Sequence, residues 1–219
     1  MKNGRITLYG SDKGGTGKTT GATNLAAILS SRGRDCLFLD ADRQESGSGW
    51  CYTRNKSSNL HRIACFQKFG KGLTQELNDL SKRYQDIIVD TGGHDSIELR
   101  AAMSIADVMI SPIQASQFDL WTLKNLDELV SQAKIFNPKL RVILVISRAS
   151  THHSEADTAH AAELVSDYER FVLSKTIIRD RVIYRRAAAL GMGVHEFPEP
   201  NEKATQEMFQ LYEEVFNND

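Results

Sequence analysis

Residues 6–20 read ITLYGSDKGGTGKTT, and this stretch by itself indicates the fold. Its apolar start, Ile6–Tyr9, predicts a short strand, and a helical pattern begins at Lys18 after a glycine-rich turn. Glycines let backbone N–H groups converge on phosphate oxygens, and a helix N-terminus adds partial positive charge there. The order of strand, glycine-rich turn and helix is therefore typical of a phosphate-binding loop. We expect its nucleotide contacts from Lys13, Gly14, Gly15, Thr16, Gly17, Lys18, Thr19 and Thr20.

The side chains of this loop have distinct predicted roles. Lys18 is expected to reach the β- and γ-phosphates, Thr19 to ligate Mg²⁺ and Thr20 to contact the α-phosphate. The strict pattern G-x-x-x-x-G-K-S/T fails, because Asp12 stands where a glycine is required, and a second lysine, Lys13, follows it. A plain turn that joins a strand to a helix is the alternative, but it gives the two lysines and two threonines no packing purpose.

With Lys13 in this register, the loop resembles the deviant Walker A motif of the ParA/MinD group of P-loop ATPases. The resemblance implies ATP or ADP and Mg²⁺ as cofactors, and it implies ATP hydrolysis. It also implies that two copies of the chain form an ATP-sandwich homodimer, with higher-order assembly left open. In that dimer Lys13 would be the catalytic lysine that reaches the partner's phosphates, and Lys18 the catalytic lysine of its own site.

Two predicted strands end in carboxylates. The apolar run Cys36–Leu39 ends at Asp40, and Ile87–Val89 ends at Asp90. Ligands of parallel α/β sheets bind at the carboxyl ends of strands, so both acids are expected beside the phosphate loop. The resemblance implies that Asp40 activates the attacking water and that Asp90 is the Walker B acid, so we expect Mg²⁺ near Thr19, Asp40 and Asp90. A helix-capping or solvated carboxylate is the alternative for Asp40.

Two further features flank these acids. Asp42 follows Asp40 at a distance of two residues and is expected near the metal, although Arg43 stands where relatives usually carry a proline. Gly92 and Gly93 follow the Walker B acid. Because glycines can change their backbone angles cheaply, this pair predicts a switch that senses the γ-phosphate.

Short apolar runs alternate with longer helical patterns along the chain. The predicted strands are Ile6–Tyr9, Cys36–Leu39, Ile63–Phe66, Ile87–Val89, Val108–Ile110, Val142–Ile146 and Thr176–Ile178. The predicted helices are Lys18–Ser31, Leu73–Arg83, Ile97–Ser104, Phe118–Phe136, Ser154–Ser166, Val182–Leu190 and Lys203–Phe216. This alternation predicts a single α/β P-loop domain over residues 1–219, with a mostly parallel central sheet and helices on both faces. The polar stretch Arg43–Asn59 is expected to be a long, mobile loop.

A basic segment lies near the C-terminus, where Asp180 is the one acid among five bases. The bases are Lys175, Arg179, Arg181, Arg185 and Arg186. By resemblance to small ParA proteins, this segment is the candidate surface for non-specific DNA binding, which acts through phosphates and depends steeply on salt. A solvated helix face is the alternative. Further along, the segment that holds Pro198 resembles the loop on the adenine side of the nucleotide in this group.

The composition excludes several other classes of protein. Lys and Arg total 27 and Asp and Glu total 28, so the net charge of the chain is close to zero and does not by itself attract DNA or an anionic membrane. Three cysteines without a CxxC pair argue against a disulfide framework or a zinc site, and they favour a reducing compartment. The start of the chain does not resemble a signal peptide, and no apolar run is long enough to span a membrane. The expected location is the cytoplasm.

The position of the phosphate loop narrows the resemblance. Because the phosphate loop begins within the first ten or so residues of the sequence, no N-terminal helix-turn-helix domain is expected. In this respect the chain resembles the short, ParF-like plasmid partition ATPases. That resemblance implies segregation of plasmid or chromosome DNA, association with the nucleoid, and a ParB/ParG-like centromere-binding partner that stimulates slow hydrolysis. A MinD-like cell-division ATPase and a small metabolic P-loop ligase are the alternatives. The acidic tail Glu196–Asp219 would be repelled by an anionic membrane, which disfavours the first of them.

Overall fold

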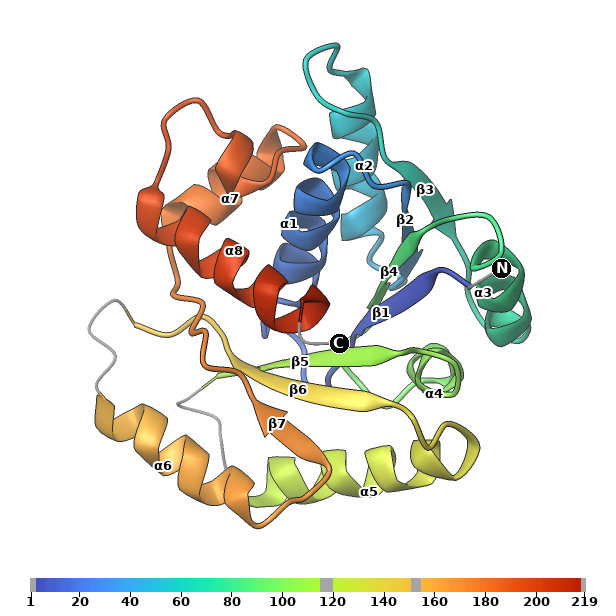
Figure 1. Ribbon diagram of the computed structural model, residues 1–219, viewed down its shortest axis with the longest axis vertical. Helices are drawn as coiled ribbons and strands as arrows, with labels where there is room; N and C mark the ends of the chain where they lie inside the picture. Colours follow the sequence, from blue (N-terminus) through green and yellow to red (C-terminus); the bar gives the residue numbers. More distant parts are fainter. Residues whose placement is uncertain (1–2, 115–119, 151–154, 218–219) are drawn as a thin grey trace.

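The computed structural model describes residues 3–114, 120–150 and 155–217 (Figure 1). At its centre lies a sheet of seven strands in the order β3-β2-β4-β1-β5-β6-β7, and every neighbouring pair in it is parallel. The strands are β1 (Arg5–Tyr9), β2 (Cys36–Ala41), β3 (Ala64–Gln67), β4 (Asp86–Thr91), β5 (Val108–Ile113), β6 (Arg141–Ile146) and β7 (Phe171–Leu173). The α/β class and the parallel sheet expected from the sequence are confirmed.

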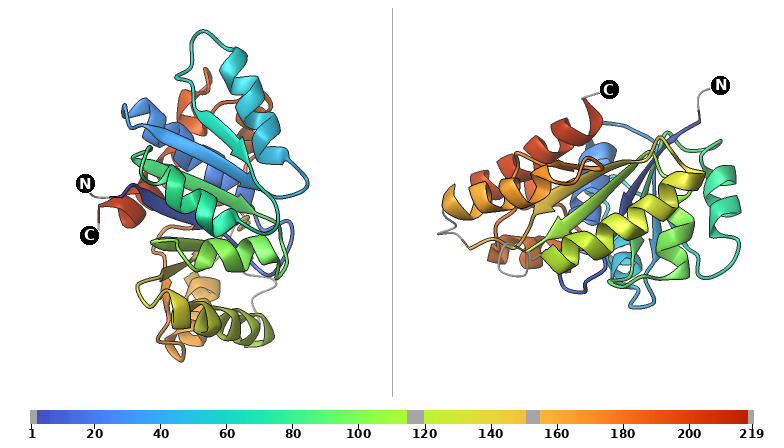
Figure 2. Two further views of the ribbon diagram at one scale, coloured as in Figure 1. Left: turned by 90° about the vertical axis from the view of Figure 1, so that its right-hand side faces the viewer. Right: turned by 90° about the horizontal axis from the view of Figure 1, so that it is seen from below.

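Helices cover both faces of this sheet, as the two views of Figure 2 show. The helices are α1 (Lys18–Ser31), α2 (Ser46–Lys56), α3 (Leu73–Leu80), α4 (Ile97–Met103), α5 (Leu120–Phe136), α6 (Glu155–Ser166), α7 (Val182–Ala189) and α8 (Glu202–Phe216), with a 3₁₀ turn, η2, at Val194–Glu196. Helices α3, α4, α5 and α6 pack on one face, whereas α1, α2, α7 and α8 pack on the other. None of the helices in the described ranges is long and apolar enough to cross a membrane.

Two apolar cores explain why the strands are apolar without interruption. On β4, Ile87 and Val89 join the core under α3 to α6, whereas Ile88 between them joins the core under α1 and α2. Successive side chains of a strand point to opposite faces, so a strand covered on both faces must be apolar at every position. Burial on both faces makes the central strands recognisable in the sequence, and their parallel pairing puts their carboxyl ends at one edge of the sheet.

The region of Arg43–Asn59 corrects one expectation, since a helix, α2, occupies most of it. Its buried residues Gly47, Trp50, Cys51 and Arg54 follow a helical spacing that the surrounding serines and glycines conceal. A Cβ on Gly47 would lie 2.4 Å from the ring of Phe38, so this glycine permits close packing on β2. Tertiary packing here overrides the local preference for a loop.

Other boundaries also differ. No strand forms over Thr176–Ile178. Instead β7 comes earlier and pairs with β6, and Ile178 N donates to Ile146 O beyond the end of that pairing. The strand expected at Ile63–Phe66 starts and ends one residue later, and the helix expected over Leu73–Arg83 ends at Leu80. The expected helix starts at Phe118 and Ser154 lie outside the described residues.

Candidate nucleotide-binding site

The loop between β1 and α1 has the backbone geometry that its glycines predict. Gly15 and Gly17 have φ angles of +72° and +98°, a left-handed region that favours glycine. Gly17 precedes the first residue of α1, and a Cβ there would lie 2.8 Å from Ser147 Oγ. Gly14 has open space on its Cβ side and is exposed. The loop therefore presents bare backbone at the start of α1, which suits contact with an anion.

Lys18 lies beneath this loop. Its ammonium donates to Lys13 O at 3.0 Å and to Ser11 Oγ at 3.2 Å, and the residue is 6% exposed. Burial lowers the pKa of Lys18, while the charge of Asp90 opposes that shift. Ser11 Oγ in turn donates to Lys13 O at 2.7 Å. The loop is thus held in a curved form around a buried cation.

Asp40 and Asp90 stand side by side at the carboxyl ends of β2 and β4. They are register partners in the parallel pairing, and both are fully buried. Among the residues that the structure describes, neither carboxylate oxygen of Asp90 accepts a hydrogen bond of ordinary geometry. Burial raises the pKa of Asp90 to about 7, although the nearby Thr19 hydroxyl partly offsets that effect. A buried carboxylate with no more than the Thr19 hydroxyl beside it among the described residues favours binding of a cation.

Mg²⁺ fits this position. It prefers oxygen ligands and is usually held by one or two carboxylates together with phosphates and water. Thr19 and Asp90 supply a hydroxyl and a carboxylate next to the loop, and their roles as metal ligands stay predictions. Within the described ranges no group of three or more His, Cys, Asp or Glu side chains forms a metal cage. A cation here would therefore complete its coordination with a nucleotide's phosphates.

Asp40 is held differently from Asp90. Its Oδ2 accepts bonds from the Ser48 backbone N at 2.7 Å and the Ser48 hydroxyl at 2.8 Å, and its Oδ1 accepts from Asp42 N at 3.1 Å. Asp40 therefore fixes the first turn of α2 and the segment before it. Sequence reasoning missed Ser48, because the region was read as a loop.

The two glycines after Asp90 approach the phosphate loop. A Cβ added to Gly93 would lie 2.4 Å from Gly14 Cα and 2.7 Å from Lys13 O, both backbone atoms. A Cβ added to Gly92 would lie no closer than 3.4 Å to any atom beyond its two chain neighbours, and that nearest atom belongs to the ring of His94. The end of β4 thus rests directly on the loop at Gly93, as a switch between the two would require.

A cavity of about 370 Å³ opens beside the loop, in the range of ligand pockets. Its polar side is the loop and the first turn of α1, from Gly14 to Gly21. Its apolar side is built from β1, β5, β6 and the C-terminal helices. The apolar lining residues are Tyr9, Ile110, Pro112, Val145, Ile178, Tyr184, Met208 and Leu211. This side suits a flat aromatic base, and the residues that form it are scattered over the sequence, which is why no local motif pointed to them.

Comparison with known proteins identifies the domain. Residues 9–194 match the CbiA family, described as the CobQ/CobB/MinD/ParA nucleotide binding domain. The chain belongs to this family. Among curated proteins it is 28% identical to the maintenance of carboxysome distribution protein A of Halothiobacillus neapolitanus, over 93% of this chain and 92% of that protein.

Two solved structures share the fold of this ParA/MinD-type ATPase domain. One is a plasmid partition protein of Borrelia burgdorferi bound to AMPPNP, with a TM-score of 0.69 and 19% identity over 97% of this chain and 98% of that one. The other is the septum site-determining protein MinD of Pyrococcus horikoshii with Mg-ADP, with a TM-score of 0.71 and 20% identity over 97% and 96%.

Lys13, the additional lysine of the phosphate loop, contacts helix α5. Lys13 Nζ donates to Thr122 Oγ1 at 2.6 Å, and both residues line a small recess with Pro112 and Gln114. Its predicted role across a dimer therefore requires Lys13 to exchange this contact for a phosphate.

Of the five bases of the predicted DNA-binding segment, two face an acid on α8 and three are exposed, and one of the exposed three, Arg185, also lines the cavity. Arg179 and Arg181 face Glu207 on α8, with nitrogen-to-oxygen distances of 3.6 and 2.6 Å. Together with Arg185 they line the nucleotide cavity. Lys175, Arg185 and Arg186 are exposed, and Arg185 also pairs with Asp180 at 3.4 Å. Pro198 is exposed and is not among the cavity's lining residues.

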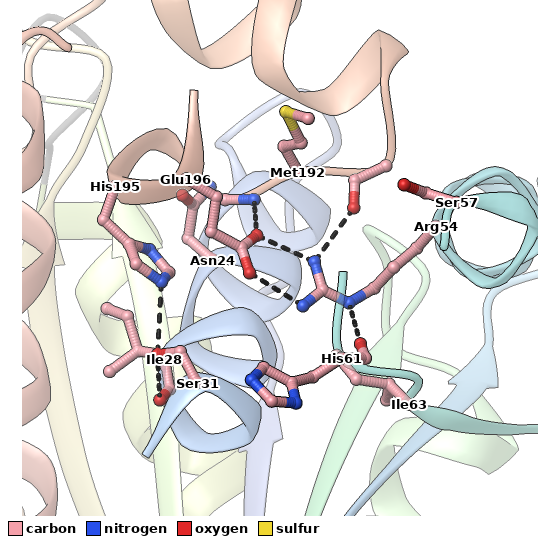
Figure 3. A network of polar contacts seen from close by, with 12 residues as sticks. Asn24, Ile28, Ser31, Arg54, Ser57, His61, Ile63, Met192, His195 and Glu196 are labelled. Atoms are coloured by element: carbon pink, nitrogen blue, oxygen red, sulfur yellow. Dashed lines mark hydrogen bonds and ion pairs between the residues drawn. The ribbon is translucent and has the colours of Figure 1, made fainter. Parts of the chain in front are cut away.

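A buried ion pair anchors the far end of α2 (Figure 3). Arg54 is fully buried, and its Nη1 and Nη2 donate to the carboxylate of Glu196 at 2.7 and 2.8 Å. Its Nε donates to His61 O at 2.8 Å. Glu196 also accepts from Gly193 N, and Val194 N donates to Asn24 on α1. The network joins α2 to α1 and to the segment that carries η2, so the helix that follows Asp40 is fixed at both ends.

Proposed function

We propose that this chain is an ATPase that drives DNA segregation through ATP-dependent dimerisation and non-specific DNA binding. One observation carries the proposal. A glycine loop with Lys13 and Lys18 lies over two buried, register-paired carboxylates, Asp40 and Asp90. The two lysines and the two acids are the residues that ATP, its cation and an attacking water require in the ParA/MinD group.

The roles of the residues follow from their positions. Lys18 and the backbone of the loop bind the phosphates, and Thr19 with Asp90 holds Mg²⁺, which neutralises phosphate charge when bound. Asp40 orients the water, once Ser48 gives up one of its two bonds to Oδ2. Lys13 leaves Thr122 and reaches the phosphates of the partner. Because Ser48 and Thr122 must release these groups, intrinsic hydrolysis is slow until a partner protein stimulates it.

The DNA surface is formed by the exposed bases Lys175, Arg185 and Arg186. Their neighbours Arg179 and Arg181 lie at the cavity, so nucleotide and DNA share one stretch of chain. Binding of ATP there alters the surroundings of the exposed bases, and the affinity for DNA changes with the nucleotide state. The protein would then be cytoplasmic and associated with the nucleoid, without a membrane partner.

A second cargo is supported by the comparison with carboxysome distribution proteins, since the relative from H. neapolitanus matches over nearly the whole of both chains. Positioning of a protein-bounded compartment would use the same ATP and DNA steps. The partner would differ, because a centromere-binding, ParB/ParG-like protein would have no role when the cargo is not DNA. Co-purification from cells with and without the cargo DNA separates the two.

Binding to random-sequence DNA tests the shared mechanism. The wild-type chain with ATP and Mg²⁺ is expected to bind, and the affinity should fall steeply as salt rises. The variant Arg185→Ala/Arg186→Ala should bind more weakly, with a salt slope shallower by up to about 2. The control Lys82→Ala/Arg83→Ala removes two exposed bases after α3 and should bind like the wild type. Absence of ATP-dependent binding at low salt would contradict the DNA proposal but leave nucleotide binding intact.

A further inference from the structure

Two of the three cysteines meet beside Asp40. Cys51 is buried on α2, and Cys65 is exposed on β3, the edge strand of the sheet. Cys65 Sγ lies 4.0 Å from Ser48 Oγ, Cys51 follows Ser48 by three residues on α2, and the two thiols are close enough to interact with each other. Both are free thiols, as is the buried Cys36 on β2. The pairing is non-local, which is why cysteine spacing did not reveal it.

The two thiols differ in the way that a redox-sensing pair requires. The interaction with Cys51 lowers the pKa of Cys65, whereas that same interaction, together with burial, raises the pKa of Cys51. Oxidant-sensitive cysteines combine an accessible, more acidic thiol with a second thiol that resolves the oxidised sulfur. Cys65 has the character of the first and Cys51 that of the second.

A short chain of contacts joins this pair to the acid of the nucleotide site. Cys65 Sγ lies 4.0 Å from Ser48 Oγ, and Ser48 donates twice to Asp40 Oδ2. Ser48 and Cys51 are three residues apart on α2, so they lie on one face of the helix. A covalent bond between the sulfurs would therefore restrict the movement of Ser48, which donates both hydrogen bonds to Asp40 Oδ2.

We propose that Cys51 and Cys65 are an oxidation site that closes to a disulfide, and that the bond fixes Ser48 on Asp40. With a peroxide as oxidant, the Cys65 thiolate attacks one oxygen, the O–O bond breaks, and a sulfenic acid forms with release of water from hydrogen peroxide. Cys51 Sγ then attacks the Cys65 sulfur, the S–S bond forms, the S–O bond breaks, and a second water leaves. The two thiols lose two electrons and the peroxide gains them.

The consequence for the site follows from the covalent link. An S–S bond of about 2.0 Å ties α2 to the edge strand, so the first turn of the helix cannot move away from β2. Both bonds from Ser48 then stay on Asp40 Oδ2, and that oxygen cannot orient a water. We therefore expect slower ATP turnover in the oxidised form, and this expectation, unlike the formation of the disulfide, rests on the proposed function.

Peptide mapping after limited treatment of the full chain with hydrogen peroxide tests the bond. We expect a Cys51–Cys65 disulfide that dithiothreitol reverses, with Cys36 left as a free thiol. Cys65→Ser changes an exposed side chain and should keep the fold while abolishing the link. Cys36→Ser is the matched control and should still form it. If Cys65 is oxidised to a sulfinic acid or to disulfides between chains while Cys51 stays reduced, the site as proposed is wrong.

Amide hydrogen exchange tests the link to Asp40 without any need for activity. Peptides that cover Ser46–Lys56 should exchange several-fold more slowly in the oxidised wild type than in the reduced form, and peroxide should leave Cys65→Ser unchanged. Equal exchange in both forms would overturn the effect on Ser48. The ATPase rate is then compared in the same samples. If slow exchange comes with unchanged turnover, the coupling to hydrolysis fails, and if neither form hydrolyses ATP, the failure belongs to the proposed function.

Discussion

Gly93 rests on Gly14 so closely that a Cβ on Gly93 would lie 2.4 Å from Gly14 Cα. Gly93 follows Asp90, the predicted Walker B acid, by three residues, and Gly14 lies in the loop between β1 and α1. The contact is between backbones, so neither residue can yield by turning a side chain. Movement of the loop that accompanies phosphate binding or release must therefore be felt at the end of β4.

Gly93→Ala should consequently weaken ATP binding and hydrolysis together. Forcing a methyl group into a packed site costs about 1–3 kcal/mol, which corresponds to a loss of affinity of about fivefold to 150-fold if the strain falls on the bound state. Titration with a fluorescent ATP analogue and a phosphate-release assay measure both effects. Gly92→Ala is the matched control, because its Cβ would meet nothing closer than 3.4 Å. If Gly93→Ala changed neither hydrolysis nor ATP-driven association, the switch role of this glycine would be lost.

The two lysines of the loop should have separable effects. Lys18→Ala removes the buried cation under the loop and should abolish binding of ATP to the monomer. Lys13→Ala removes a contact with Thr122 and should leave ATP binding largely intact while preventing dimerisation with ATP. Equilibrium nucleotide binding and light scattering report on the two steps. A Lys13→Ala chain that still dimerises with ATP would refute the role of this lysine across the dimer.

Asp90 should make the empty protein sensitive to pH. Its folded pKa is raised from 3.8 to about 7, so it stabilises the fold below the unfolded value and loses that contribution as pH rises through 7. Without nucleotide or Mg²⁺, wild-type stability relative to Asp90→Asn should fall by about 1.4 kcal/mol per unit between roughly pH 4 and pH 7. Urea unfolding of both chains at several pH values measures the difference. A difference independent of pH in this range would show that Asp90 is not protonated in the empty site.

The Arg54–Glu196 pair should matter more for stability than exposed pairs. Glu196→Ala leaves a buried guanidinium without its carboxylate and should cost about 3–5 kcal/mol. Asp95→Ala breaks the exposed pair with Arg100 and should cost less than about 1 kcal/mol. The double variant Arg54→Met/Glu196→Leu should recover much of the loss, because no unpaired charge remains. Denaturant unfolding checks all three, and equal losses for the two single variants would contradict the role of burial.

Local pattern in the sequence was sufficient for the class of fold and for the phosphate end of the site. The glycines and lysines of residues 13–20 lie in one short turn between a strand and a helix, so a local motif revealed them, although distant residues such as Gly93 and Thr122 also contact this turn. The middle of each central strand is apolar because both faces are covered, so the acids near the strand ends were predictable as well, although β2 and β4 each extend two residues beyond the apolar run. Asp40 and Asp90 meet as a direct result of parallel pairing.

Tertiary structure alone decided the rest, because those features depend on contacts between distant segments. Helix α2 forms in a stretch rich in serine and glycine since Gly47, Trp50 and Cys51 pack on β2 and its neighbours. The sequence placed Arg181 in the candidate DNA-binding segment, yet its ion pair with Glu207 holds it beside the cavity at the phosphate loop. The partners of Asp40 and of the two thiols come from α2 and β3, and only the packing of α2 against the sheet brings them together.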